Sequence, residues 1–175
     1  MKHTILFLSL FFFAGCSSTN YPPLETVSKV DVNRYMGKWY EIARLPFDRQ
    51  KHCTCTTAEY AIIDNETISV LNSCRDTVDN ELSTAEGKAF VVEGSNNAKL
   101  KVQFFWPFKG DYWVIDLDTL NYSYALVGMP SRKYAWILSR TPVMDPVFFQ
   151  RAVNHLRSTG FDVERLIETK QGECR

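Results

Sequence analysis

From residue 37 onward, the sequence consists of short runs in which apolar and polar residues alternate. Alternation with a period of two is typical of β-strands that bury one face, because successive side chains of a strand point to opposite sides. Residues that favour turns, mainly Asp, Asn, Gly and Pro, separate the runs. The predicted strands are residues 38–45, 55–63, 67–73, 83–92, 99–105, 112–117, 122–128 and 134–139. Connections this short favour antiparallel neighbours, so the sequence predicts an all-β domain, either an up-and-down barrel or a sandwich.

A single helix is predicted after the last strand. Asp145 suits its N-cap and Pro146 suits its first position. Between Phe149 and Leu156 the apolar residues recur at intervals of three and four, which forms one apolar stripe. Gly160 is expected to end the helix. Because the opposite face is polar, the helix should pack on the outside of the sheet.

The composition bounds the size and the partners of the domain. A chain of 175 residues with 45% hydrophobic residues is enough for one buried core and short for two. Lys and Arg number 20, as do Asp and Glu, so no net charge favours nucleic acid as a partner. Aromatic residues make up 14% of the chain, which provides large side chains for a core or for the lining of a cavity.

The first sixteen residues have the pattern of an export signal. An apolar run, residues 5–13, follows one lysine and leads into Ala14, Gly15 and Cys16. The run is too short to span a bilayer comfortably as a helix. Its end resembles the lipobox of bacterial lipoproteins, in which the Cys receives a diacylglyceryl group, although Phe13 stands where those proteins usually carry Leu. Residues 1–15 are therefore expected to form the signal peptide, and residues 16–30 the lipidated N-terminus and tether.

Ser17 indicates where such a lipoprotein would be retained. In enteric-type bacteria an Asp directly after the lipidated Cys tends to retain the protein at the inner membrane, and Ser17 is not Asp. We therefore expect a location at the outer membrane with the domain facing the periplasm. Acyl chains on Cys16 would hold the protein to the membrane.

Four further cysteines remain for structural roles, namely Cys53, Cys55, Cys74 and Cys174. An even number of cysteines in an oxidising compartment favours disulfides, and four cysteines allow three pairings. A metal site is the alternative, since His52 adjoins Cys53 and Cys55. A tetrahedral site would need a second Cys or His pair, which the sequence does not offer, so we expect disulfides and no metal.

Several sequence blocks, taken together and in order, resemble the lipocalin family. They are GKWYEIARLP (37–46), CTTAEYAIID (55–64), AKLKVQFFWPF (98–108), DYWVIDLD (111–118), YSYALVG (122–128) and YAWILSRTP (134–142). The likeness runs from about Val30 to Gln171. It is strongest to the outer-membrane lipoprotein lipocalins of bacteria and extends to apolipoprotein D and to insect pigment-binding lipocalins.

The resemblance implies a definite fold for residues 31–175. Lipocalins form an eight-stranded antiparallel up-and-down barrel that is open at one end and carries a C-terminal helix on its outside. By similarity to the family, Trp39 faces inward at the closed end and Arg140 lies across its ring. A guanidinium can stack on an indole, and Gly37 allows a tight turn into the strand below. These three residues are therefore expected to close the barrel rather than to contact ligand.

A lipocalin holds its ligand inside the barrel, so the resemblance implies a ligand site among the inward-facing residues. We expect the lining to include Ala58, Tyr60, Val70, Asn72, Ala89, Val102, Phe104, Tyr112, Val127, Trp136 and Leu138. Such a lining suits an elongated hydrophobic molecule. Its headgroup is expected to meet Tyr60, Asn72 or Tyr112 near the mouth.

The resemblance also implies a pairing for the cysteines. In apolipoprotein D and the insect proteins, a Cys five residues before the Tyr of the second strand is bridged to a Cys near the C-terminus. The residues at the matching positions are Cys55 and Cys174. Cys53 and Cys74 would then form the second bridge.

The function that follows from the resemblance is binding, storage or transport of fatty acids, lysophospholipids or similar apolar molecules. A tetrapyrrole or a carotenoid is the alternative ligand, as in the pigment-binding relatives. Catalysis is not expected, because the chain lacks a Gly-x-Ser-x-Gly elbow, a phosphate loop and a metal-binding His pair. No cofactor is expected. Family members can dimerise, which makes a second copy of the chain a further candidate partner.

Overall fold

The fold is described here from a computed structural model, which describes residues 21–172 and Cys174. The expected signal peptide and the expected lipidation site, Cys16, lie outside these residues. Eight strands form the main sheet: β1 (Gly37–Arg44), β2 (Cys53–Ile62), β3 (Thr67–Asp76), β4 (Leu82–Val91), β5 (Lys99–Phe105), β6 (Phe108–Leu117), β7 (Tyr124–Gly128) and β8 (Ala135–Ser139). A two-residue strand, β9 (Ile167–Glu168), adds to β1. The helices are α1 (Val32–Tyr35) and α2 (Pro146–Ser158), with short 3₁₀ turns η1 (Asp48–Gln50) and η2 (Val163–Arg165).

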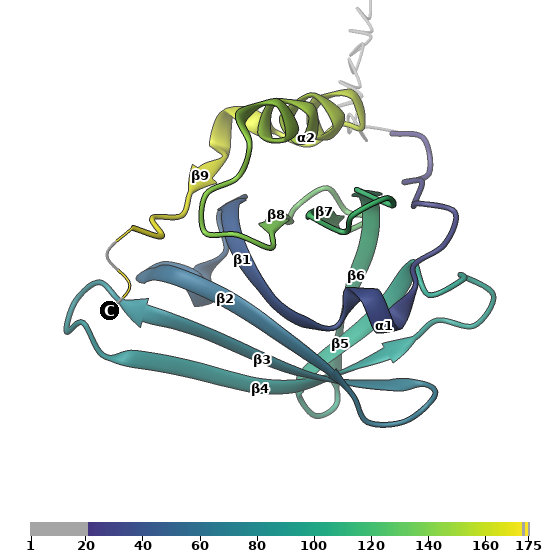
Figure 1. The fold of residues 1–175 in the computed structure, drawn as a ribbon, viewed down its shortest axis with the longest axis horizontal. Coiled ribbons are helices and arrows are strands. Elements are labelled where there is room, and N and C mark those ends of the chain that lie inside the picture. Colours follow the sequence, from purple (N-terminus) through teal and green to yellow (C-terminus); the bar gives the residue numbers. More distant parts are fainter. Residues whose placement is uncertain (1–20, 173, 175) are drawn as a thin grey trace, which may run out of the picture.

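The eight strands close into an antiparallel barrel (Figure 1). Each strand pairs with the next along the chain, and β1 pairs with both β8 and β2, which closes the ring. The pairing of β1 with β2 covers only its first half, from Gly37 opposite Tyr60 to Tyr40 opposite Thr57. Of the two architectures that the alternation allowed, the chain therefore adopts the barrel.

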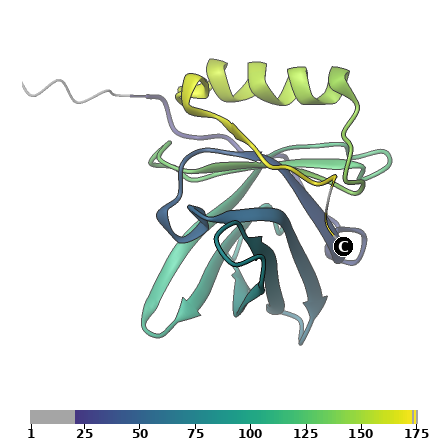
Figure 2. The ribbon, with the colours of Figure 1, turned by 90° about the vertical axis from the view of Figure 1, so that its left-hand side faces the viewer.

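Buried apolar side chains form two separate clusters, one inside the barrel and one under α2. In β7, Ala125 and Val127 point into the barrel, whereas Tyr124 and Leu126 point outward and pack beneath the helix. A strand that is buried on both faces needs an uninterrupted apolar sequence, which the YALVG segment provides. Figures 1 and 2 show α2 lying across this side of the barrel.

Helix α2 has the ends that the sequence predicts. The Asp145 carboxylate accepts a hydrogen bond from the backbone N–H of Val147 at 2.7 Å, and Pro146 begins the helix. The helix ends before Gly160, whose φ of +88° lies in the left-handed region that favours glycine. Its buried residues, Ala152 and Leu156, contact the outer face of the barrel. No helix within the described residues has the length and the apolar character needed to cross a membrane.

Several strand boundaries differ from the prediction. The sixth strand was predicted to begin at residue 112, but β6 begins at Phe108, and a two-residue connection joins it to β5. The seventh strand begins at Tyr124 rather than at residue 122, because Asp118 holds the preceding loop through hydrogen bonds to Ser123. β9 was not predicted, because two residues are too few to show a pattern.

Candidate functional site

The barrel is closed at one end by a stack of Arg140 on Trp39. The guanidinium carbon lies 3.8 Å from the centre of the indole, which is fully buried. Arg140 also donates hydrogen bonds to the carbonyls of Lys38, at 2.9 Å, and Arg34, at 2.6 Å. The indole N–H donates to the carbonyl of Tyr35 at 2.8 Å. The stack of Arg140 on Trp39 and the hydrogen bonds to the backbone thus fix the closed end of the barrel, which is called the floor below.

Gly37 is the residue at which the chain turns from α1 into the first strand. Its φ of +87° is a conformation that residues with a Cβ rarely adopt. The turn places the start of β1 next to the Arg140 side chain, so the geometry of the floor depends on it. Asp31 caps α1 just before this turn by accepting a hydrogen bond from the backbone of Arg34.

Three tyrosines lie directly above the floor, with their hydroxyl groups in contact; Tyr35 and Tyr60 are buried and Tyr112 is half-buried. The hydroxyl oxygen of Tyr112 lies 2.8 Å from that of Tyr35 and 3.0 Å from that of Tyr60. Three hydroxyl protons serve only two contacts, so one O–H donor of the cluster has no partner among the described residues. Burial raises the pKa of Tyr60 to about 12, and the cluster stays neutral at physiological pH. The cluster can therefore donate one hydrogen bond to an acceptor inside the barrel.

The position of these tyrosines corrects one expectation. The sequence analysis placed the Tyr60 and Tyr112 hydroxyls near the mouth of the barrel. Tyr60 pairs with Gly37 at the closed end, and the ring of Tyr35 contacts both Tyr60 and Trp39. Depth along a barrel depends on how far neighbouring strands are staggered, which alternation alone does not reveal.

The other expected lining residues lie on the inner face. The buried inner cluster contains Tyr60, Val70, Ala89, Val127 and Leu138, and Ala58, Val102, Phe104, Tyr112 and Trp136 pack against it. Asn72 lies opposite Ala58 on β2 and opposite Ala85 on β4, so it shares their face. Its buried Oδ1 accepts no hydrogen bond from the described residues. A bound molecule with a donor group could satisfy this oxygen.

Two hollows of different size lie in the barrel, one near the floor and one between β4 and β5. Near the floor, beside Tyr35 and Leu100, the structure leaves a void of only about 10 Å³. A hollow of about 390 Å³ lies in the wall between β4 and β5, and its lining includes both inner-face and outer-face residues. They are Gly87 and Phe104 on the inner face, Glu86, Lys88 and Gln103 on the outer face, and Trp106 at the hairpin tip. This hollow arises because the pairing of β4 with β5 ends at Lys88 and Gln103, beyond which the two strands are no longer paired. A Cβ at Gly87 would lie 2.8 Å from the Phe104 ring, so the glycine makes room for this side chain.

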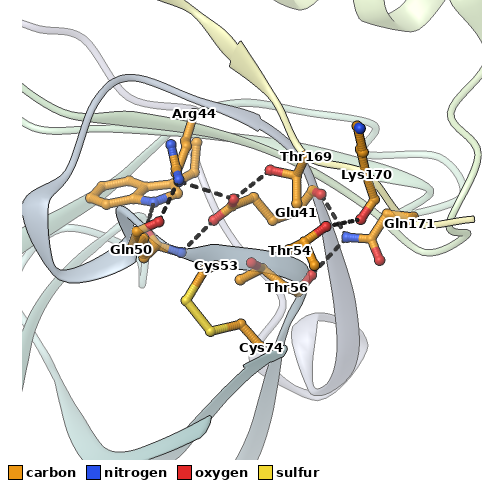
Figure 3. Close-up of polar contacts among 11 residues, drawn as sticks. Glu41, Arg44, Gln50, Cys53, Thr54, Thr56, Cys74, Thr169, Lys170 and Gln171 are labelled. Atoms are coloured by element: carbon orange, nitrogen blue, oxygen red, sulfur yellow. Dashed lines mark hydrogen bonds and ion pairs between the residues drawn. A yellow bond between two sulfur atoms is a disulfide. The ribbon is translucent and has the colours of Figure 1, made fainter. Parts of the chain in front are cut away.

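A buried polar network, which the sequence analysis did not identify, lines the wall beside the mouth (Figure 3). The Glu41 carboxylate accepts hydrogen bonds from Thr169, at 2.6 Å, and from the Gln50 side chain, at 2.7 Å. Arg44 lies 3.4 Å from this carboxylate and donates to the Gln50 carbonyl at 2.6 Å. The Trp136 indole donates to the Gln50 side chain at 3.1 Å. The network thus fixes the orientation of one aromatic residue of the lining.

The C-terminal segment completes this wall where β1 separates from β2. The Gln171 side chain donates to the carbonyls of Glu41 and Thr56, both at 2.8 Å (Figure 3). The Lys170 carbonyl accepts from the backbone N–H of Cys55 at 2.8 Å. Both disulfides are present in the structure: Cys55 is bonded to Cys174, and Cys53 to Cys74. The described residues contain no cluster of side chains suited to a metal ion.

The buried Glu41 leads to a prediction about pH. Glu41 is only 3% exposed, and burial raises its pKa above the usual 4.5 despite the hydrogen bonds and Arg44, which oppose the shift. In the unfolded chain the carboxyl group ionises at lower pH than in the fold. The stability that Glu41 contributes through this pKa difference is therefore complete below pH 4.5, and it is lost as the pH rises through the raised pKa of Glu41 in the fold. We expect the stability of the wild type relative to Glu41→Gln to fall over this range.

Urea unfolding of both proteins at a series of pH values measures this difference. Subtracting the two curves removes the contributions of the other carboxyl groups, some of which shift in the opposite direction, as Asp118 does. Parallel curves above pH 4.5 would contradict the prediction.

Comparisons with known proteins show extensive similarity. Residues 30–171 match the family described as lipocalin-like domain. The chain is 40% identical over 171 residues to outer membrane lipoprotein Blc of Vibrio cholerae serotype O1, covering 98% of this chain and 99% of that protein. It is 31% identical over 160 residues to apolipoprotein D of Bos taurus, covering 88% of this chain and 82% of that protein.

A solved structure supports the same architecture. Insecticyanin from the tobacco hornworm Manduca sexta superposes with a TM-score of 0.71 at 25% identity. The superposition covers 87% of each chain.

Proposed function

This chain belongs to the lipocalin family, and we propose that it is a lipid-anchored outer-membrane protein that binds, stores or transports fatty acids or lysophospholipids in its barrel. The observation that carries the proposal is a barrel that Trp39 and Arg140 close at one end, with an apolar inner face and a hollow between β4 and β5 beside Phe104. The similarity to outer membrane lipoproteins and the lipobox at Cys16 support the location, with the domain facing the periplasm.

The arrangement of polar groups favours a ligand whose charged head stays at the mouth. The hollow between β4 and β5 is lined by Lys88 and Glu86, which are exposed, so a phosphate or a carboxylate held there would keep most of its hydration. Bringing a full charge down to the neutral tyrosine cluster would cost several kcal/mol, which one hydroxyl donor does not offset. A neutral acceptor, such as an ester carbonyl, suits the cluster better. The acyl chain would then run along Phe104 and Val102.

Native mass spectrometry of the protein purified from its own membrane tests the proposal. We expect the folded protein to carry a bound fatty acid or lysophospholipid that is released on unfolding. Absence of any bound lipid, together with unchanged fluorescence of Trp136 on titration with either lipid, would count against the function. A Trp136→Phe variant identifies which part of the fluorescence change belongs to that residue.

A bulky residue on the inner face should block the site. Ala58 is half-buried and points inward, opposite Asn72, so Ala58→Phe would place a phenyl ring in the path of an acyl chain. We expect the affinity for lysophosphatidylcholine to fall at least about tenfold, which is about 1.4 kcal/mol. Isothermal titration calorimetry measures the change.

Ala61→Phe is the matched control. Ala61 lies on the same strand, is exposed and pairs with Ser69 on the outer face. This variant should bind as the wild type does. Equal losses in the two variants would mean that the binding site is not on the inner face.

A tetrapyrrole or a carotenoid is the second candidate ligand. The rings of Phe47, Tyr134 and Trp136 contact one another at the mouth and provide flat apolar surfaces for a conjugated molecule. A visible absorption band in the purified protein would favour this ligand over a fatty acid.

A further inference from the structure

Three large aromatic side chains are exposed together on the hairpin between β5 and β6. Trp106 is 86% exposed, Phe108 is 77% exposed and Phe105 is 58% exposed. Apolar side chains that are exposed together on a protein surface mark a site that binds a partner or a membrane. The hairpin tip belongs to the open end of the barrel, because β1 begins at the closed end and each following strand runs antiparallel to the one before it.

Basic residues surround these aromatic side chains. The β1–β2 loop (45–52), the hairpin tip (105–110) and the β7–β8 loop (129–134) carry Arg49, Lys51, Lys109, Arg132 and Lys133. The only acidic residue in the same three segments is Asp48. The Arg49 guanidinium lies 4.9 Å from the Phe105 ring, which links two of the segments. These three segments are called the open rim below.

The start of the described chain lies at the same rim. Arg132 of the β7–β8 loop donates a hydrogen bond to the Pro22 carbonyl, and its guanidinium lies 5.7 Å from the Tyr21 ring. In Figure 2 the first described residues, the β1–β2 loop and the hairpin tip all lie toward the left-hand side. Tyr21 follows Cys16 by five residues, which span at most about 18 Å. An acyl anchor on Cys16 would therefore keep the open rim beside the bilayer.

We propose that the open rim docks on the surface of an anionic phospholipid bilayer, with Trp106 and Phe108 among the headgroups, so that the mouth of the barrel opens onto the membrane. Aromatic rings flanked by Lys and Arg are the composition that suits a membrane interface. The acidic β3–β4 turn, with Asp79 and Glu81, belongs to the same end of the barrel, where the backbone N–H of Thr77 donates to the His52 carbonyl at 2.7 Å, but it extends to the left in Figure 1, away from the hairpin tip. The anchoring part of the argument rests on the proposed lipidation of Cys16, whereas the charge and the exposed rings do not.

Docking in this orientation has a consequence for exchange of the ligand. The hollow beside Phe104 and Trp106 would face the headgroups directly. An acyl chain could then pass between bilayer and barrel along apolar side chains, without being exposed to water on the way.

Vesicle binding by the mature chain with Cys16→Ser tests the docking without the anchor. The probes are vesicles of phosphatidylethanolamine with phosphatidylglycerol, compared with vesicles of phosphatidylcholine alone. We expect binding to the anionic vesicles that weakens as salt is added, and a loss of at least about tenfold in the double variant Phe105→Ser with Phe108→Ser, called the rim variant below, because neither of these exposed residues lines the hollow. Co-sedimentation with the vesicles measures the fraction of protein that is bound.

A matched control uses two exposed apolar residues away from the rim. Leu120 is 79% exposed in the β6–β7 loop at the closed end, and Val143 is 81% exposed before α2. Changing both to Ser should leave vesicle binding unchanged. Equal binding by the rim variant and the wild type, or an equal loss in this control, would overturn the proposal.

Two further readouts separate this inference from the proposed function. Calorimetry with monomeric lysophosphatidylcholine should give the same affinity for the rim variant and the wild type. Transfer of a fluorescent lysophospholipid from vesicles to protein should be at least about tenfold slower in the rim variant. A wild type that binds vesicles but no lysophospholipid would refute the proposed ligand and leave the docking intact. A wild type with the reverse behaviour would refute the docking.

Discussion

Replacing both Cys55 and Cys174 with serine is expected to lower the free energy of unfolding by about 5 kcal/mol. This disulfide joins residues separated by 119 positions, so its loss restores a large chain entropy to the unfolded state. The segment it holds has few other attachments to the barrel, chiefly the two-residue strand β9 and the contacts of Thr169 and Gln171. Releasing it would also expose the wall around Glu41.

The second disulfide provides the comparison. Cys53 and Cys74 are separated by 21 positions, and the same relation gives roughly 3 kcal/mol for the variant with serine at both. Urea unfolding without reductant, for the two double variants and the wild type, measures both differences. A smaller loss for the Cys55 and Cys174 pair than for the Cys53 and Cys74 pair would contradict the entropic argument.

The alternation of side chains predicted the strands and the inner face well, because both depend on local geometry. The outward residues of β7, Tyr124 and Leu126, were not assigned from the sequence, although an apolar run of five residues is typical of a strand that is buried on both faces. Closure into a barrel did not follow from the alternation. It depends on the pairing of Gly37 with Tyr60 at the ends of the sheet, and the family resemblance supplied it.

An irregularity in the pairing of β1 with β8 explains why the alternation did not reveal the inward position of Arg44. In β1, Trp39 and Glu41 point inward, and a shift in register between Glu41 and Ala43 then turns Ala43 outward and Arg44 inward. A strict alternation would have placed Arg44 on the outside. The inward position of Glu41, on the same face as Trp39, was available as a signal, but a buried carboxylate requires partners. Gln50 and Thr169 come from segments with no strand pattern, so the network could not be assembled from the sequence.

The same limitation applies to the exposed hairpin. Its aromatic residues are part of the FFWPF segment, which belongs to the family resemblance and was assigned partly to the lining. Only the arrangement of the strands shows that Phe104 points inward while Trp106 and Phe108 remain exposed. Pro22, near the start of the described residues, reaches the same rim through its contact with Arg132, 110 positions away.

Replacing Trp39 with alanine is expected to lower the free energy of unfolding by about 3 to 5 kcal/mol, the usual range for a buried tryptophan. The variant leaves the Arg140 guanidinium without the ring beneath it and the Tyr35 carbonyl without its donor. It also opens the floor, so the affinity for lysophosphatidylcholine should fall although Trp39 is not expected to touch the ligand. Thermal unfolding and calorimetry measure the two effects.

A variant of a second tryptophan distinguishes the role of Trp39 in closing the barrel from the loss of stability that removing any indole would cause. Trp113 lies on β6 and packs against the outer cluster under α2, and the Lys99 ammonium lies 4.1 Å from its ring centre, so it also pairs a ring with a cation. It is outside the barrel, however, and only half-buried. Trp113→Ala should cost less stability than Trp39→Ala and leave ligand affinity unchanged. If both variants lost affinity equally, global loosening of the barrel would account for the effect, and Trp39 would have no special part in closing the cavity.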